Sequence, residues 1–186
     1  MLSFLFFSSV LICLCSCASG AAVRERKPYV YLTEDTSKFI LLPPGAIENS
    51  MDMAQQVFVS FQGRNLFLNA WVKADETGLD MTLLNELGAT MGELFYRDGA
   101  VSLSSSVLPG SLDPGYIVAD FQFCFYNAPA LQQALEACGL SFESTGNSRR
   151  ILQGKYVVAE IEKSSGSVRL INHARGYTYT LKGDFE

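Results

Sequence analysis

The sequence predicts an α+β domain in which an antiparallel sheet packs against two or three helices. Three observations predict this class. Short apolar segments follow one another with only a few turn residues between them, a spacing that suits antiparallel pairing and is too short for parallel crossovers. After Pro109 the pattern changes to helix-capping signals. Several of the strand segments also carry apolar side chains on both faces, so the sheet needs cover on both sides.

Seven strands are expected in the first part of the chain. Turn residues separate them, and Asp98-Gly99 is the sharpest of these signals because it lies between two apolar segments, as in a two-residue type I′ hairpin. The strands are expected at residues 29–32, 39–42, 57–62, 66–74, 79–84, 92–97 and 100–103.

A first helix is expected after Asp113, which stands at an N-cap position before Pro114. Apolar residues then recur at helical spacing, at Ile117, Phe121, Cys124 and Phe125. However, the alternation of Phe121, Phe123 and Phe125 is typical of a strand. Both interpretations therefore stay open for this segment.

The second helix has clearer signals. Asn127 caps it, Pro129 lies in its first turn and Gly139 ends it. Its apolar stripe consists of Leu131, Leu135 and Cys138. Three more strands are expected after it, at residues 156–161, 168–172 and 177–181.

The apolar side chains on both faces of the strands leave two arrangements open. One is a curved sheet wrapped around a helical plug, with apolar space between them. The other is a plain α+β domain whose sheet packs tightly and leaves no cavity. Trp71, on the expected strand 66–74, is either a residue that gates such a cavity or ordinary core packing. Arg149 and Arg150 either place a cation at the mouth of an apolar pocket, beside Asp120 or an acidic ligand, or are solvated turn residues.

The amino terminus resembles a bacterial lipobox. The residues Leu14-Cys15-Ser16-Cys17 follow an apolar run without charge. We therefore predict a lipoprotein signal peptide at residues 1–16, a lipidated Cys17 with a tether at residues 17–28, and a single domain at residues 29–186. Ala18 favours the outer membrane, with the domain facing the periplasm. The alternative is an ordinary secretory signal, cut near Ala18 or Gly20, and a soluble periplasmic or secreted protein.

Composition argues against several functions. The net charge is −5 and no basic stripe occurs, so a nucleic-acid partner is not expected. The single histidine, His173, disfavours most metal sites and most Ser-His catalysis, and no phosphate-binding, dinucleotide or nucleophile-elbow motif occurs. We predict no cofactor, no metal and no enzymatic activity. The weakest hypothesis is a hydrolase that uses one of Ser104, Ser105 and Ser106 with His173.

Two cysteines remain after the lipidated position, Cys124 and Cys138. An oxidising periplasm would permit them to form a disulfide. We favour two small buried apolar residues, since free cysteine is among the most buried residue types.

Several short motifs resemble, in their order, a family of uncharacterised bacterial outer-membrane lipoproteins whose fold is similar to that of the lipoprotein carrier LolA and receptor LolB. They cover residues 39–182. These motifs are Phe39-Ile40-Leu41-Leu42-Pro43-Pro44, Gln55 or Gln56, Asn85-Glu86-Leu87-Gly88-Ala89-Thr90, the stretch 94–101, Leu108-Pro109-Gly110, the stretch 119–123, an arginine before a strand, and Gly176-Tyr177-Thr178-Tyr179.

The resemblance implies an antiparallel half-barrel closed by helices around an apolar cavity, which in LolA and LolB takes acyl chains. It also implies association with pathways that make fatty-acid-like or polyene products. Phe123-Cys124-Phe125-Tyr126-Asn127 departs from the family's more aliphatic segment. A LolB-type receptor would need a protruding loop with an exposed leucine, for which Leu84 and Leu87 are candidates. The recurrent polar and turn positions of the family fall on Asp120, Gln122, Arg149, Gly176 and Tyr177.

These observations lead to one expected function and one alternative. The expected function is non-covalent binding of a hydrophobic acyl, lipid or polyene-type ligand by an outer-membrane lipoprotein, for lipid or lipoprotein transport, with a lipoprotein or a biosynthetic-pathway protein as a further partner. The alternative is a structural or assembly lipoprotein that engages a protein partner through its surface. The cavity wall is expected to consist of Val59, Phe61, Leu68, Trp71, Leu94, Phe121 and Phe125.

Overall fold

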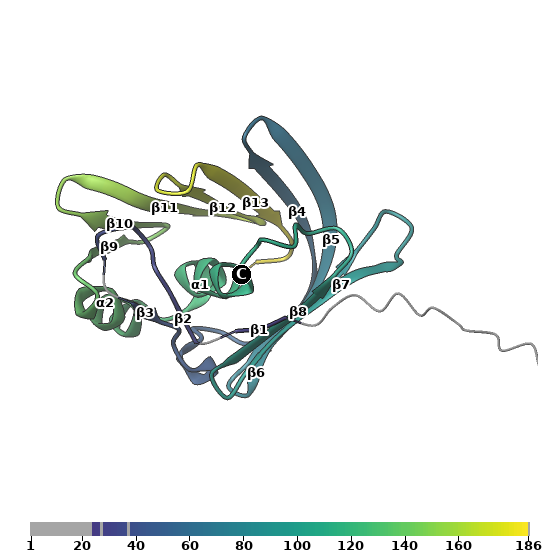
Figure 1. The fold of residues 1–186 in the computed structure, drawn as a ribbon, viewed down its shortest axis with the longest axis horizontal. Coiled ribbons are helices and arrows are strands. Elements are labelled where there is room, and N and C mark those ends of the chain that lie inside the picture. Colours follow the sequence, from purple (N-terminus) through teal and green to yellow (C-terminus); the bar gives the residue numbers. More distant parts are fainter. Residues whose placement is uncertain (1–23, 27, 37, 186) are drawn as a thin grey trace, which may run out of the picture.

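One antiparallel sheet of 11 strands curves around helix α1 (Figure 1). The computed structural model describes residues 24–26, 28–36 and 38–185. The predicted signal peptide at residues 1–16 and the lipidation site Cys17 lie outside the described residues. Residues 24–26 fall within the predicted tether, yet they form a short strand that pairs with β8.

Thirteen strands, two α-helices and one 3-10 helix make up the described residues. Their order along the chain is β1 (Arg24–Arg26), β2 (Tyr29–Val30), β3 (Phe39–Ile40), η1 (Pro44–Ala46), β4 (Met51–Phe61), β5 (Arg64–Asp75), β6 (Gly78–Leu84), β7 (Thr90–Arg97), β8 (Ala100–Ser105), α1 (Pro114–Phe125), α2 (Ala128–Ala137), β9 (Ser141–Thr145), β10 (Ser148–Gln153), β11 (Tyr156–Ser164), β12 (Ser167–Asn172) and β13 (Tyr177–Lys182).

The strand order of the main sheet is β1-β8-β7-β6-β5-β4-β13-β12-β11-β10-β9. The last strand, β13, pairs with β4. This pairing joins the strands that precede the helices in the chain, β4 to β8, to the strands that follow them, β9 to β13. Strands β1 and β9 remain as edges, so the sheet is open and resembles a half-barrel. The α+β class, with a curved antiparallel sheet and two helices, is confirmed.

The hairpin turns follow the chemistry of the sequence. Asp98 and Gly99 both have positive φ, +51° and +76°, as a type I′ turn requires. The β4–β5 hairpin uses the same geometry at Gln62 and Gly63, one position earlier than the turn residues Gly63-Arg64-Asn65 suggest. The hairpin formed by β9 and β10 was not expected from the sequence.

Residues 114–125 form helix α1 and not a strand, which settles the two interpretations that the sequence left open. Asp113 caps it as predicted, with its Oδ1 atom accepting a hydrogen bond from the amide of Gly115 at 3.0 Å. Phe121, Phe123 and Phe125 are all buried because the helix lies inside the curve of the sheet (Figure 1). A helix that is covered on nearly all sides shows no clean amphipathic stripe, which is why its sequence also resembles a strand.

Helix α2 has the predicted signals. Asn127 Oδ1 accepts from the amide of Ala130 at 2.9 Å, and Gly139 ends the helix with a φ of +86°. Leu131 and Leu135 are fully buried. This helix packs near β9 and β3, at the opposite end of the sheet from β8 (Figure 1).

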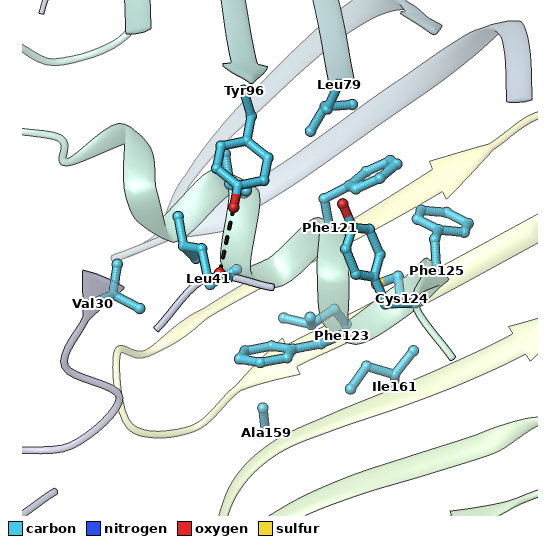
Figure 2. Close-up of a cluster of buried hydrophobic side chains, with 14 of the residues drawn as sticks. Val30, Leu41, Leu79, Tyr96, Phe121, Phe123, Cys124, Phe125, Ala159 and Ile161 are labelled. Atoms are coloured by element: carbon cyan, nitrogen blue, oxygen red, sulfur yellow. Dashed lines mark hydrogen bonds between the residues drawn. The ribbon is translucent and has the colours of Figure 1, made fainter. Parts of the chain in front are cut away.

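A core of aromatic and aliphatic side chains fixes α1 against the sheet (Figure 2). The ring of Phe123 packs on Phe39, with centroids 5.3 Å apart. Tyr96 is buried, and its hydroxyl donates to the carbonyl of Leu42 at 2.8 Å and contacts that of Leu41 at 3.4 Å (Figure 2). Burial raises the pKa of Tyr96, so this hydroxyl stays protonated as a donor.

Candidate functional site

A cavity of about 1240 Å³ lies between the concave face of the sheet and helix α1. Side chains from β4 to β8 and from β13 form its wall, and α1 with the loop before it forms the opposite side. Most of the lining is aliphatic or aromatic. The lining residues from the central strands include Val57, Leu66, Leu68, Ala70, Met81, Leu83, Leu94, Leu103, Tyr179 and Leu181.

The two-residue period of the strands decides which side chains reach this cavity. On β5, Leu66, Leu68 and Ala70 line it, whereas Phe67 and Trp71 point to the other face and are substantially exposed. The inner face of β5 is therefore made of smaller aliphatic residues than the outer face. The small side chain of Ala70 leaves space at the centre of the wall.

Five of the seven residues expected at the cavity wall line it. Val59 and Phe61 do so from β4, Leu68 from β5, Leu94 from β7 and Phe121 from α1. Leu68, Leu94 and Phe121 are buried, Val59 is half-buried, and Phe61 lies at the edge of the cavity with 44% of its surface exposed.

Trp71 and Phe125 do not line the cavity. Trp71 is on the convex face of the sheet because it is one residue out of phase with Ala70, and its indole Nε1 donates to Asp52 Oδ1 at 2.8 Å. Phe125 packs in the core at the end of α1, with its ring centroid 4.9 Å from that of Phe121 and 5.6 Å from that of Phe185. It packs against Phe121, which lines the cavity, without reaching the cavity itself.

A buried polar chain crosses the cavity wall between β12, β13 and α1. Asn172 Nδ2 donates to the hydroxyl of Tyr177 at 3.0 Å, and that hydroxyl donates to Asp120 Oδ2. Asp120 and Tyr177 both line the cavity, as two of the family positions singled out in the sequence. The chain satisfies the polar atoms of Tyr177 while leaving its ring toward the apolar space.

Burial raises the pKa of both ionisable groups in this chain. Burial raises the pKa of Asp120 to about 7, and the opposing effects of the Tyr177 hydrogen bond, the Arg175 charge and Asn172 are smaller. Burial, and then the Asp120 charge, raise the pKa of Tyr177 far above its ordinary value. Tyr177 therefore stays neutral, and Asp120 changes its charge near pH 7.

Gln122 holds the chain segment before η1 against α1. Its Oε1 atom accepts from the amide of Leu42 at 3.0 Å, and its Nε2 atom donates to the carbonyl of Leu42 at 2.8 Å. The side chain is fully buried and outside the cavity lining. Gln122 therefore has a structural position, linking α1 to the chain segment at Leu42.

Arg149 lies inside β10, is buried, and is not at the mouth of the cavity. Its Nη1 atom donates to the carbonyls of Phe123, Cys124 and Tyr126 at 2.9, 3.2 and 2.8 Å, and its Nη2 atom pairs with Glu48 at 2.9 Å. Of the two alternatives left open for these arginines, neither describes Arg149, because the orphan carbonyls at the end of α1 take its guanidinium. Arg150 pairs with Glu143 at the surface.

Gly176, the remaining family position, ends the turn between β12 and β13. It has a φ of +69°, which favours glycine, and its amide donates to the carbonyl of Asn172 at 2.9 Å. The turn brings its neighbour Arg175 to the rim of the cavity, and Arg64 lies at the same rim from β5. The sequence reasoning missed both arginines, because adjacency to turn glycines does not reveal which cavity a side chain borders.

The serine and histidine residues of the hydrolase hypothesis are not brought together. Ser105 and Ser106 bond to the backbone carbonyl of Met91, and His173 Nε2 pairs with Glu160 at 2.5 Å. Five strands separate β8 from β12 in the order of the sheet. Among the described residues, no group of three metal-ligating side chains gathers in one place.

Both cysteines in the folded domain are free and buried. The Sγ atom of Cys124 lies 3.5 Å from the hydroxyl of Tyr179, and burial raises the pKa of this thiol to about 12. Cys138 Sγ donates to the carbonyl of Leu135 at 3.1 Å. These are the inert apolar residues that the sequence favours over a disulfide.

Leu87 is the most exposed large apolar residue of the described part of the chain, with 93% of its surface accessible. It sits between β6 and β7, where Asn85 Oδ1 accepts from the amides of Leu87 and Ala89 at 3.0 and 2.9 Å. Leu84, the other candidate for a protruding leucine, is half-buried at the end of β6. No helix in residues 24–185, as far as they are described, is both long and apolar enough to span a bilayer.

A comparison with known families gives one match. The family described as "Protein of unknown function (DUF3261)" matches residues 52–183, which is more than half of the chain and includes β4 to β13 with both helices. No curated protein matches the chain. All the strands and the helix that line the cavity are within the matched region.

Proposed function

We propose, from the premise that this chain belongs to the DUF3261 family of proteins of unknown function, that its cavity binds a hydrophobic acyl, lipid or polyene-type ligand non-covalently. In this proposal the protein is an outer-membrane lipoprotein, held on the bilayer by a lipidated Cys17 and facing the periplasm. It takes part in lipid or lipoprotein transport, and its protein partner is a lipoprotein or a member of a biosynthetic pathway. The resemblance to LolA and LolB supports the direction of this proposal.

The cavity is the observation that carries the proposal. Its volume of about 1240 Å³ is larger than the range of roughly 300–1,000 Å³ that is usual for small-molecule sites. Most of the residues that line it are aliphatic or aromatic, and the polar ones are a minority. Binding would be driven by removal of apolar surface from water, at about 25 cal/mol per Å².

A pair of neighbouring substitutions separates cavity binding from other effects. Val59 lines the cavity, whereas the adjacent Phe58 points to the convex face. Val59→Trp would fill part of the cavity with an indole ring, and Phe58→Trp would add similar bulk outside it. The full chain and both variants would be produced in a bacterial host and extracted in mild detergent, and their bound lipids would be measured by mass spectrometry.

The expected result is a hydrophobic ligand near one per protein in the unchanged chain and in Phe58→Trp. The amount of ligand bound to Val59→Trp should be lower by at least about fivefold, because the indole ring and the ligand cannot occupy the same volume. A folded, empty protein in all three cases would contradict the proposal. Equal ligand in all three would show that the lipid binds elsewhere.

The membrane anchor has a separate test. Cys17→Ser should move the protein from the membrane fraction to the soluble fraction and abolish incorporation of a palmitate analogue, because the acyl chains supply the anchoring free energy. A soluble, unlabelled protein with Cys17 intact would support the secretory alternative and leave the cavity proposal standing.

Exposed aromatic residues favour the second candidate function, a surface that engages a protein partner. Phe58 and Phe67 form a pair on the convex face, with ring centroids 4.8 Å apart, and Trp71 and Phe95 are exposed on the same face. Exposed apolar patches often mark interaction sites. Under this alternative, Phe67→Lys would remove a cross-linked partner protein and Val59→Trp would not, whereas ligand content would be zero throughout.

A further inference from the structure

We propose that the rim of the cavity formed by Arg64 and Arg175 is an anion subsite, which binds the carboxylate or phosphate head group of a single-chain amphiphile. This inference rests on the proposed function, since the chain of the amphiphile would occupy the apolar cavity. It adds the chemical class of the head group and the residues that bind it.

The two arginines come together through the register of the sheet. Phe61 is the register partner of Arg64 on β5 and of Tyr177 on β13. The β4–β5 turn at residues 62–63 and the β12–β13 turn at residues 173–176 are therefore neighbours at one end of the sheet. Arg64, at the start of β5, and Arg175, in the β12–β13 turn, both line the cavity at this end.

Arg175 is held in place by aromatic groups. Its Cζ atom lies 3.3 Å from the ring centroid of Tyr116, and its Nη2 atom donates to the carbonyl of Tyr31 at 3.5 Å. The hydroxyl of Tyr116 donates to the same carbonyl at 2.9 Å. Stacking occupies the face of the guanidinium, and the N–H groups along its edge other than the one bonded to Tyr31 match the geometry of carboxylate and phosphate oxygens.

Arg64 and Arg175 differ from the other arginines of the described domain because neither forms an ion pair, and the charge of Arg175 acts on Asp120 only from a distance. Six arginines occur between residues 38 and 185, and the four that do not line the cavity each form an ion pair with a carboxylate. Arg64 and Arg175 form no ion pair with any described carboxylate. An anion from outside the protein could pair with these two cations and neutralise their charge.

Two acidic residues share the lining, Glu34 and Asp120. Glu34 is exposed to solvent, and the carboxyl group of Asp120 already accepts the hydrogen bond from Tyr177. Burial raises the pKa of Asp120 to about 7, so its charge is incomplete at neutral pH. The rim therefore has an excess of positive charge in a chain whose net charge is −5.

The opposite part of the cavity has no charged lining. Leu83 and Gln55 are register partners of Ala70, six residues along β5 from Arg64, which corresponds to roughly 20 Å at about 3.3 Å per residue. Met81, Leu94 and Leu103 continue this apolar wall. A charged rim at one end and an apolar wall at the other fit a ligand with a head and a tail.

Three ligands of equal chain length would test the subsite by calorimetric titration of the full chain at pH 7, where Asp120 is only partly ionised. They are hexadecanoic acid, hexadecyl phosphate and the neutral hexadecan-1-ol. We expect at least one of the two anions to bind about tenfold or more tightly than the alcohol. The tighter of the two anions identifies whether the head group is a carboxylate or a phosphate.

The variant Arg64→Gln/Arg175→Gln should lose this preference and keep its affinity for the alcohol. Arg169→Gln is the matched control, because Arg169 lies on β12 outside the lining and pairs with Glu162. Tyr116→Leu should reduce the ratio of anion to alcohol affinity severalfold, since it removes the ring that positions Arg175. All variants are compared by this ratio, because a general loss of folding, or a change in the apolar lining at Tyr116, would weaken the acid, the phosphate and the alcohol alike.

Equal affinities for the acid, the phosphate and the alcohol would overturn the subsite and leave the apolar cavity as the binding site. An anion preference that survives in Arg64→Gln/Arg175→Gln would also overturn it. Absence of binding by all three ligands to the folded, unchanged chain would instead count against the proposed function itself.

Discussion

The hydroxyl of Tyr177 donates a hydrogen bond to the carboxyl group of Asp120 and so joins β13 to helix α1 at the wall of the cavity. Asn172 holds the tyrosine from the other side. The bond ties the last strand of the chain to the helix inside the sheet. It also places a titrating group in an apolar environment, which makes the stability of the fold depend on pH.

The first prediction concerns this pH dependence. The folded chain keeps a proton on Asp120 up to a pKa of about 7, whereas the unfolded chain releases it near the ordinary value of 3.8. Between these values the folded state binds more protons, so the free energy of unfolding decreases as pH rises from about 4 to about 7. The total contribution is up to about 4 kcal/mol, at 1.36 kcal/mol per pKa unit.

Asp120→Asn removes this contribution because the amide does not titrate. Urea unfolding of both proteins between pH 4 and pH 8 would therefore show the variant gaining stability relative to the unchanged chain as pH rises. A stability difference that is constant across this range would mean that Asp120 titrates normally. Glu160→Gln, at a half-buried position paired with His173, provides a comparison outside the cavity.

Arg149 and Arg150 are neighbours in β10, and we expect their removal to destabilise the fold to very different extents. Arg149→Ala leaves three carbonyls at the end of α1 without their charged donor, which should cost at least about 3 kcal/mol of unfolding free energy. Arg150→Ala removes an exposed ion pair and should cost less than about 1 kcal/mol. Equal shifts in the midpoint of urea unfolding would contradict the capping role of Arg149.

Chain length should control affinity if the cavity takes an acyl chain. Each additional CH2 group that is buried contributes about 0.8 kcal/mol, so two carbons should tighten Kd roughly 15-fold. Titration with saturated fatty acids of increasing length should show this slope until the cavity is full. In Val59→Trp the slope should end at a shorter chain, and a flat dependence in the unchanged chain would exclude burial of the tail.

Leu87 should affect the rate at which the protein delivers its ligand to a membrane, and not the affinity of the cavity for that ligand. Its side chain is exposed on a turn that Asn85 orders, so it is available to enter a bilayer or a partner. Leu87→Glu removes roughly 2 kcal/mol of apolar burial, which should slow delivery of a fluorescent fatty acid to vesicles by about tenfold or more. The neighbouring change Glu86→Ala is the control, and an unchanged rate in Leu87→Glu would exclude this role.

Much of the fold follows from local sequence signals. Turn residues and short apolar segments predict most strands of the main sheet, and the caps Asp113 and Asn127 predict both helices. The hairpin of β9 and β10 is missed because β9, at the edge of the sheet, is almost entirely polar. Its only partly buried residue is Phe142, too little to produce an alternating pattern.

The site is harder to predict because both faces of β5 carry apolar side chains. Sequence shows that Trp71 and Ala70 must face opposite sides, but it does not show which side contains the cavity. The small size of Ala70 and Ala74, both on the inner face, is a signal that large outer residues such as Phe67 obscure. Arg175 escapes prediction for another reason, since its partners Tyr116 and Tyr31 lie far away in the chain.

The alternation along β5 allows the two surfaces of the protein to change independently. A substitution at Leu68 or Ala70 alters the size or shape of the cavity and leaves the exterior as it was, and one at Phe67 or Trp71 does the reverse. A one-residue insertion in the strand would exchange the two faces, placing the aromatic rings inside and the small residues in solvent. Point substitutions can therefore change the cavity or the outer contacts separately, whereas a change in the length of this strand would alter both at once.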